Sequence, residues 1–310
     1  MTPVQPPKTP ASDEHVLLVG HGYVGTAAAR MLAATGRRVT AVKRTVGPRD
    51  LQEARDHGVT LLAADVLTDD GLDLMPGDAD VIILAIAPGG REVARYQDAY
   101  VAAPRRVTQH QQRPPRLVLM TTSTAVYDAD DGSWVTEDLP VTAPTPTSAA
   151  MHEGELALPA LAAHSVALRL GGIYGPGRER LVKQVLAGSA SCSPDNWTNR
   201  IHRDDAARAI THLVLRSEPP PPILNVVDDR PAKRCEVLTW LAAQLGAPTP
   251  GSDAPAVGGR RSGSKRVSNR LLHAVGWDPV HPSYVEGYAA TIARRRSDSD
   301  VETDQQGRVV

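Results

Sequence analysis

Short apolar runs rich in β-branched residues recur along the chain. They occupy residues 16–19, 39–42, 60–64, 81–85, 117–121, 166–170 and 223–227. The stretches between most of them, such as residues 27–35 and 91–112, have the apolar spacing of helices, and Pro104 should kink or break the second one. Runs that are apolar on both faces and alternate with helices are typical of a parallel sheet covered on each side. The sequence therefore predicts a doubly wound α/β fold.

The alternation becomes irregular beyond about residue 172. We expect residues 14–171 to form the main domain and residues 172–294 to form mainly a smaller C-terminal substrate lobe, with residues 199–228 returning to the main sheet. Residues 1–13 and 295–310 are polar and read as disordered tails. Residues 251–263 are rich in Gly, Ser and Arg, as loops that cover a site often are.

Composition narrows the function classes. The 310 residues carry 34 Lys and Arg against 35 Asp and Glu, a net charge of -1, which argues against a nucleic-acid partner. No apolar stretch approaches the roughly 20 residues of a membrane helix, and the N-terminus lacks a signal peptide's apolar region. The two cysteines, Cys192 and Cys235, lack the spacing of a zinc or redox site, so we expect free thiols in a reducing compartment. A cytoplasmic protein with no membrane partner and no metal is the expectation.

The segment VLLVGHGYVG, residues 16–25, places Gly-x-Gly-x-x-Gly directly after an apolar strand and before a helical stretch. In such a loop Gly20 makes the tight turn, Gly22 lets the backbone approach a pyrophosphate, and Gly25 allows close packing of helix on strand. The pyrophosphate then lies at the helix N-terminus, where free N–H groups and the helix dipole favour an anion. These features predict a Rossmann-type dinucleotide-binding domain.

The end of the second strand indicates which dinucleotide is bound. An Asp or Glu there would accept hydrogen bonds from the ribose of NAD, but this strand ends with Lys43 and Arg44. A guanidinium can bind a 2′-phosphate through two hydrogen bonds, which favours NADPH/NADP+. Asp65 follows the third strand and is placed to meet the adenine edge, although an Asp in this position is often a turn residue.

Three further segments make the sequence from about residue 14 to 290 resemble the extended short-chain dehydrogenase/reductase superfamily, especially its atypical epimerase/dehydratase-like members. They are TTSTAVY at residues 121–127, LRLGGIYGPGR at residues 168–178, and NRIHRDD at residues 199–205. The resemblance implies that Ser123 is the catalytic Ser that bonds the reacting carbonyl oxygen, with Thr122 beside it. Tyr127 matches a structural Tyr, for which we expect a packing role.

The resemblance also implies further contacts. Around the cofactor, besides the residues already named, it implies His21, Tyr23, Val24, Val66, Ala85, Ala87, Thr121 and Gly171. Bordering the substrate it implies Tyr174, Arg178, Trp197, Asn199 and His202. Asp205 reads as the N-cap of a helix over residues 206–215.

One departure from the superfamily concerns its Tyr-x-x-x-Lys pair, in which Lys lowers the pKa of a Tyr that acts as acid or base. The matching positions are Thr147 and Met151, and no Tyr or Lys occurs anywhere in residues 128–173. Oxidising an alcohol requires a base, whereas reducing a ketone requires only a polarised oxygen and a later proton. The lack of a base therefore favours ketone reduction over alcohol oxidation as the reaction of this protein.

Three functions compete. The first is an NADPH-dependent ketoreductase, similar to those that tailor aromatic polyketides such as angucyclinones, with a small-molecule ketone as substrate. The second is a nucleotide-sugar epimerase or dehydratase, which would need the missing base. The third is a non-catalytic NADP(H)-binding sensor or scaffold. The missing dyad favours the first, with a phenol of the substrate supplying the proton.

Overall fold

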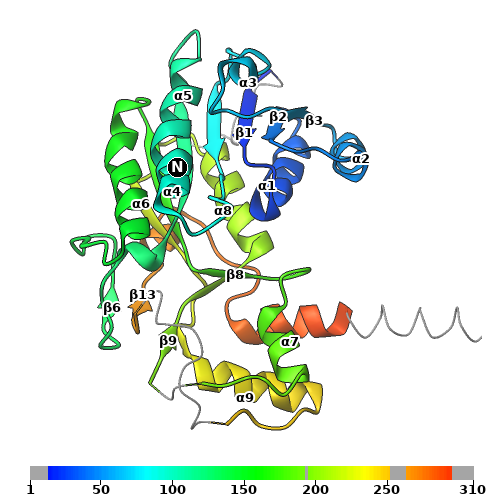
Figure 1. The fold of residues 1–310 in the computed structure, drawn as a ribbon, viewed down its shortest axis with the longest axis vertical. Helices are drawn as coiled ribbons and strands as arrows, with labels where there is room; N and C mark the ends of the chain where they lie inside the picture. Colours follow the sequence, from blue (N-terminus) through cyan, green and yellow to red (C-terminus); the bar gives the residue numbers. More distant parts are fainter. Residues whose placement is uncertain (1–12, 193–194, 252–262, 295–310) are drawn as a thin grey trace, which may run out of the picture. The chain divides into compact units, whose positions relative to one another are not determined.

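The computed structural model describes residues 13–192, 195–251 and 263–294. Its main feature is a seven-stranded sheet (Figure 1). The strands are β1 (His15–Val19), β2 (Arg38–Lys43), β3 (Val59–Ala63), β4 (Val81–Leu84), β5 (Leu117–Ser123), β7 (Ser165–Leu170) and β11 (Ile223–Val226). All seven strands predicted from the sequence are confirmed, and with them the Rossmann-like α/β fold.

The strand order is β11-β7-β5-β4-β1-β2-β3. The chain moves outward from β1 to β3, returns to place β4 on the other side of β1, and continues to β5. The order therefore reverses between β1 and β4. In parallel sheets ligands bind outside the carboxyl ends of the strands at such a reversal.

The helices separate the strands as expected. They are α1 (Tyr23–Ala33), α2 (Pro48–Asp56), α3 (Asp69–Asp73), α4 (Val93–Gln97), α5 (Ala103–Gln109), α6 (Pro146–Ala157), α7 (Arg180–Leu186), α8 (Arg203–Leu215), α9 (Arg234–Leu245) and α10 (Arg270–Ala274). Residues 284–294 are also helical. None of the helices in these described ranges has the length and apolarity needed to cross a membrane.

Pro104 does not interrupt the helical path in the way the sequence suggested. A π-helical turn, η1 (Asp98–Ala102), joins α4 to α5, and Pro104 lies in the first turn of α5. The N–H of Ala103, the residue before Pro104, still donates to the carbonyl oxygen of Asp98 across the π-helical turn, so the helical path continues up to the proline. The π-helical turn, which is wider than an α-helical turn, accommodates Pro104 without a break in the helix.

The chain divides into two compact units that exchange segments. The first consists of the chain up to Thr121 together with Glu153–Ala167 and Ala207–Pro222, and the second consists of Thr122–His152, Leu168–Ala206 and the chain from Ile223 onward. Within residues 199–228, Ile223–Val226 joins the large sheet, whereas β10 (Arg200–His202) pairs instead with β8 (Gly172–Tyr174).

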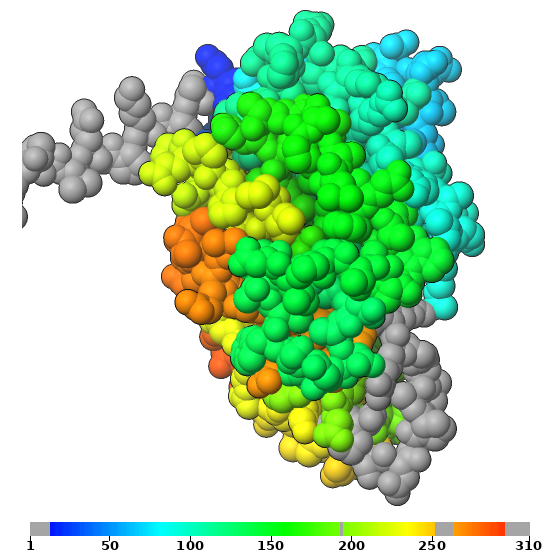
Figure 2. Space-filling model, turned by 90° about the vertical axis from the view of Figure 1, so that its left-hand side faces the viewer, coloured from blue at the N-terminus to red at the C-terminus, as the bar shows by residue number. Residues whose placement is uncertain are grey.

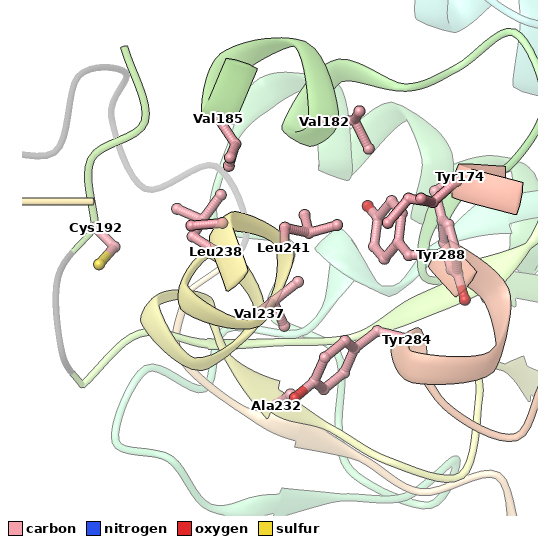
Figure 3. Packing of buried hydrophobic residues seen from close by; sticks show 12 residues of the cluster. Tyr174, Val182, Val185, Cys192, Ala232, Val237, Leu238, Leu241, Tyr284 and Tyr288 are labelled. Atoms are coloured by element: carbon pink, nitrogen blue, oxygen red, sulfur yellow. The ribbon is translucent and has the colours of Figure 1, made fainter. Parts of the chain in front are cut away.

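The core of the first unit surrounds β1, whose five residues are all buried. The α1 helix covers this region with Val24, Ala28 and Leu32. In the second unit a separate cluster joins α7, α9 and the C-terminal helix (Figure 3). Two further short sheets belong to this unit, β6 (Trp134–Val135) with β13 (Arg266–Val267) and β9 (Trp197–Thr198) with β12 (Ala232–Lys233).

The expectation of two free thiols is wrong. Cys192 and Cys235 form a disulfide across 43 residues of sequence, within the core cluster of the second unit. The sequence could not reveal the pair because the two residues come together only when α9 packs beside α7. Pairing also removes the cysteine-based argument for a reducing compartment.

Two other expectations need comment. Asp205 does not cap a helix over residues 206–215, because α8 already begins at Arg203. Its carboxylate instead accepts hydrogen bonds from the backbone N–H groups of Val280 and His281. The expected tails and most of the loop at residues 251–263 lie outside the described residues.

Candidate cofactor and substrate sites

The glycine turn follows β1 directly, and each glycine meets a different constraint. Gly20 has a φ of +103°, and a Cβ there would lie 2.3 Å from the carbonyl oxygen of Ala85. A Cβ on Gly25 would lie 2.1 Å from the carbonyl oxygen of Gly20. At Gly22 the nearest atom would be 3.9 Å away, so the protein itself leaves room there. Gly20 and Gly25 are required by the fold, whereas Gly22 keeps a space open.

That space faces the start of α1. The helix begins at Tyr23, its N-cap is Gly22, and no side chain caps its first turn, which also contains no acidic residue. Uncapped N–H groups and the positive end of the helix dipole favour a bound anion. The arrangement suits the pyrophosphate of a dinucleotide, as the sequence motif predicted, and places Val24 behind the loop in the core.

His21 lies within the same turn and is buried. Burial holds its pKa below the usual value, so the ring is neutral near pH 7. Its Nδ1 has no hydrogen-bond partner among the described residues. A buried polar atom without a partner is costly unless a ligand or water satisfies it. The turn therefore fits a bound dinucleotide on three counts: its open space, a helix N-terminus that no side chain caps, and this unsatisfied nitrogen.

The two cations at the end of β2 have different surroundings. The Lys43 ammonium donates to Asp50 at 2.7 Å, and Asp50 also accepts from the backbone of Gly47 at the start of α2. The Arg44 guanidinium is exposed, and within the described ranges it has no acidic partner. Sequence reasoning overlooked Asp50, which lies seven residues beyond Lys43. Of the two, Arg44 remains available to a phosphate.

The other predicted cofactor contacts in the first unit lie at strand ends. Asp65 uses one carboxylate oxygen to accept from the N–H of Leu67, so it is in part the turn residue considered as its alternative role. Val66 is buried, while Ala85 and Ala87 follow β4. Thr121, near the end of β5, donates to the carbonyl oxygen of Leu84 at 3.4 Å.

Ser123 is the last residue of β5 and the N-cap of a short 3₁₀ turn, η2 (Thr124–Val126). Its hydroxyl oxygen accepts a hydrogen bond from the N–H of Ala125 at 3.2 Å. Because the oxygen acts there as acceptor, its own O–H is left to donate elsewhere. Thr122 is buried and directs its hydroxyl to the carbonyl oxygen of Leu168 at 3.5 Å. Ser123 is thus the better placed of the two as a donor.

A buried polar network fixes the turn that carries Ser123. The Tyr127 hydroxyl donates to Asn225 at 2.9 Å and accepts from Arg169 at 2.7 Å. The Arg169 guanidinium also lies 4.7 Å from the centre of the Tyr127 ring. Lys265 donates to the backbone carbonyl oxygen of Tyr127, and burial lowers the pKa of this lysine to about 8. Tyr127 is therefore a packing residue.

Sequence reasoning missed Arg169, Asn225 and Lys265. The signal for Arg169 was a cation inside an otherwise apolar strand, residues 165–170, since such a charge needs a buried partner. Nothing local in the sequence marked the other two. Gly171 lies next to this region, where a Cβ would come within 3.0 Å of Val227.

The two residues matched to the superfamily's Tyr and Lys lie on α6. Thr147 shares a hydrogen bond with the Thr145 hydroxyl at 3.1 Å, and Met151 is buried. Green atoms of the segment that contains α6 reach the molecular surface (Figure 2), and Leu156 of this helix is exposed. Neither Thr147 nor Met151 offers an ionisable group.

Four of the five predicted substrate residues serve internal packing. Tyr174 is buried and stacks on Tyr288 with ring centres 4.5 Å apart. Asn199 bonds the backbone at Lys265 and at Val267. Trp197 packs under the cations of Lys233 and Arg266.

His202 is buried against His281, with ring centres 3.9 Å apart. Burial, with His281 beside it, lowers the pKa of His202 to about 4. One atom each of His202, Asp205 and His281 lies within 4.8 Å of the others, a spacing that a metal could use. In this structure Asp205 accepts a hydrogen bond from His281 Nδ1 at 2.8 Å, so these two ligand atoms are already paired with each other. The cluster ties α8 to the C-terminal segment.

Arg178, the fifth residue, lines a groove of about 440 Å³. The groove lies along α7 and the turns at its two ends. It is lined by Gly177, Arg178, Glu179, Arg180, Lys183, Gln184 and Ser189. Three cations against one acid give it a positive character, which suits an anionic ligand. Burial lowers the pKa of Arg234 of α9, and the nearby charges of Arg180 and Arg200 lower it further.

The parallel sheet and the glycine turn at the end of β1 define a Rossmann-type nucleotide-binding protein. A family model, the NAD dependent epimerase/dehydratase family, matches residues 16–226. The chain belongs to this family. No curated protein sequence matches it.

Solved structures agree with this placement. A protein from Methylobacillus flagellatus assigned as an NAD-dependent epimerase/dehydratase is 32% identical, with a TM-score of 0.77 over 91% of this chain and 99% of that one. UDP-glucuronic acid 4-epimerase from Bacillus cereus, bound to NAD and a fluorinated UDP-sugar, is 18% identical with a TM-score of 0.75 over 88% and 96%. A dTDP-glucose 4,6-dehydratase from Streptomyces venezuelae with NAD bound is 19% identical, with a TM-score of 0.75 over 91% and 96%. The last two share the fold.

Proposed function

We propose that this protein is an NADPH-dependent ketoreductase that works without a Tyr and Lys dyad. The observation that carries the proposal is the pairing of a Ser123 hydroxyl free to donate with a helix α6 that offers Thr147 and Met151 where an acid or base would be needed. Bound NADPH would supply the hydride. The protein's task is then to hold the ketone, polarise its oxygen and let a proton reach it.

Ser123 polarises the carbonyl oxygen by hydrogen bonding, and this bond strengthens as negative charge develops on the oxygen. A Ser hydroxyl is too weakly acidic to give up its proton readily near neutral pH. The proton therefore comes from the substrate, through a phenol next to the ketone, and water replenishes it. A neighbouring phenol already bonded to the carbonyl has the proximity that an enzyme residue would otherwise provide.

This requirement favours an aromatic polyketide ketone of the angucyclinone type over an aliphatic ketone. Exchanging the phenol for its methyl ether should abolish reduction while leaving binding largely intact, measured as NADPH consumption and as ligand affinity. Unimpaired turnover of the ether would contradict substrate assistance. If NADPH binds but no ketone is reduced, the protein is the sensor or scaffold considered from the sequence.

The groove along α7 favours a second candidate, a nucleotide-sugar substrate. Its cations Arg178, Arg180 and Lys183 would face the phosphate groups of such a molecule. The epimerase and dehydratase of similar fold act on sugars of this kind by name. In calorimetry, a UDP-sugar should bind the native protein and bind Arg180→Ala at least about tenfold more weakly, the effect of one charge-assisted hydrogen bond. Equal affinity for both proteins would exclude this use of the groove.

A further inference from the structure

The Cys192–Cys235 disulfide is close in the chain to one end of the groove along α7, because Cys192 follows the lining residue Ser189 by three residues. Cys192 ends the segment that leaves α7, and Cys235 is the second residue of α9. Figure 3 shows Cys192 beside the cluster in which Val185 of α7 and Leu238 of α9 meet. The disulfide therefore joins the chain that borders the groove to a neighbouring helix.

Besides the disulfide, apolar packing of Ala190 and Cys192 on the core cluster and a few hydrogen bonds hold that segment among the described residues. The N–H of Ser189 donates to Gln184, and both residues line the groove. The carbonyl oxygen of Ser191 accepts from Arg234 Nε at 3.3 Å, and Ser191 forms a single bridge to Gly251. Arg234 also reaches the Gln184 amide oxygen at 3.4 Å. The two hydrogen bonds from Arg234 are long and partly exposed, and they are weak compared with a covalent link.

We propose that the Cys192–Cys235 disulfide is a redox-sensitive clamp that sets the affinity of the groove for phosphorylated ligands. The inference rests on the second candidate function, in which the groove binds phosphate groups. Oxidation fixes Ser189, which follows α7, next to the cations of that helix. Reduction releases this end of the groove, so part of the free energy of phosphate binding is used to order it and the affinity falls.

The two cysteines differ in solvent exposure, and this difference suits thiol–disulfide exchange. Cys192 is buried, whereas Cys235 is partly exposed. Cys235 lies in the first turn of the 12-residue α9 and follows Lys233 and Arg234, features that favour a thiolate.

The oxidation can be written with a small disulfide such as glutathione disulfide as the oxidant. The Cys235 thiolate attacks one sulfur of this molecule, forming a mixed disulfide and releasing one glutathione. The Cys192 thiolate then attacks the Cys235 sulfur and releases the second glutathione. The protein loses two electrons and two thiol protons, and the small disulfide is reduced to two thiols.

Calorimetry with inorganic pyrophosphate tests the clamp in the full-length protein, with NADPH present at saturation so that the glycine turn, which also suits a pyrophosphate, is already occupied. One sample is equilibrated with glutathione disulfide and the other with a phosphine reductant, and thiol counting verifies each state. We expect the reduced protein to bind at least about fivefold more weakly, the lower end of ordinary coupling between linked sites. Two free thiols remaining after oxidation, or equal affinity in the two states, would overturn the proposal.

Cys235→Ser is the matched variant, because it breaks the disulfide at the partly exposed position and leaves Cys192 in the core. It should bind pyrophosphate like the reduced protein and should not respond to reductant. A response to reductant in this variant would contradict the assignment of the effect to this disulfide. If the oxidised native protein binds no pyrophosphate at all, the phosphate-binding groove itself is wrong, which is distinct from equal binding in both states.

Discussion

Arg44 and Lys43 are neighbours at the end of β2, but their charges are used differently. Asp50 neutralises Lys43, whereas Arg44 has no acidic partner in the described ranges. Arg44→Ala should therefore weaken NADPH binding about 10- to 150-fold, the range for losing a charge-assisted pair, and leave NADH nearly unchanged. Lys43→Ala is the control and should change the preference little. Calorimetry with both cofactors measures this, and equal affinity of the native protein for NADH and NADPH would exclude the role.

Ser123 offers a second test at the same scale. Ser123→Ala removes the proposed donor to the carbonyl oxygen and should lower kcat about 10- to 1,000-fold. Cofactor affinity should hardly change. Thr122→Val serves as a comparison, since its hydroxyl already bonds Leu168. If Ser123→Ala turns over ketone at the native rate, the hydroxyl has no part in the chemistry.

His202 should make stability depend on pH. Its folded-state pKa of about 4 lies below the ordinary value, so its contribution is fully present above pH 6.5, is lost progressively as the pH falls below that value, and is gone once the pH has passed the folded value. At pH 5 the loss is about 2 kcal/mol. The groups around it are His281, Asp204, Asp205, Arg203 and the edge of Tyr174.

Urea unfolding of the native protein and of His202→Gln at pH 7.5 and pH 5 isolates this contribution. Asp228 acts in the opposite sense, because burial raises its pKa, so only the difference between the two proteins is informative. The variant should lose less stability than the native protein on acidification. An equal loss in both would show that His202 is not responsible.

At the scale of elements, the junction of β1 and α1 separates the needs of the fold from those of the ligand. The free energy of unfolding of Gly22→Ala should lie within about 1 kcal/mol of the native value, because the new Cβ would meet nothing closer than 3.9 Å. The same variant should lose dinucleotide binding. Gly25→Ala should destabilise the unit, because its Cβ would lie 2.1 Å from the Gly20 carbonyl oxygen. Thermal unfolding and cofactor titration together measure this contrast. Unchanged binding in a stable Gly22→Ala protein would contradict the site.

At the scale of the whole molecule, the disulfide constrains the unfolded chain of the second unit. It spans 43 residues, for which loop entropy gives a stabilisation of about 4 kcal/mol. Calorimetric unfolding with and without reductant should show one transition moving to lower temperature. Cys235→Ser should unfold at the lower temperature in both conditions. An unmoved transition after verified reduction would mean that the link contributes nothing to global stability.

The sequence was sufficient for features that local patterns encode. All seven strands of the large sheet follow from apolar runs, and the turn after β1 follows from the spacing of three glycines. It was insufficient wherever partners lie far apart in the chain. The sequence did not show that Asp50 pairs with Lys43 or that Asn225 accepts a hydrogen bond from Tyr127. It also did not show that Tyr174 and His202, the substrate candidates, are buried in the protein interior. These contacts depend on which elements become neighbours.

The sequence by itself determined the α/β class, the position of the glycine turn and the lack of any Tyr or Lys in residues 128–173. Periodicity and backbone sterics act over a few residues, so they can be read directly. Only the tertiary structure decided that Cys192 pairs with Cys235, that Arg44 has no acidic partner among the described residues, and that Arg178 lines a groove. Burial and pairing depend on segments that the chain brings together only when it folds.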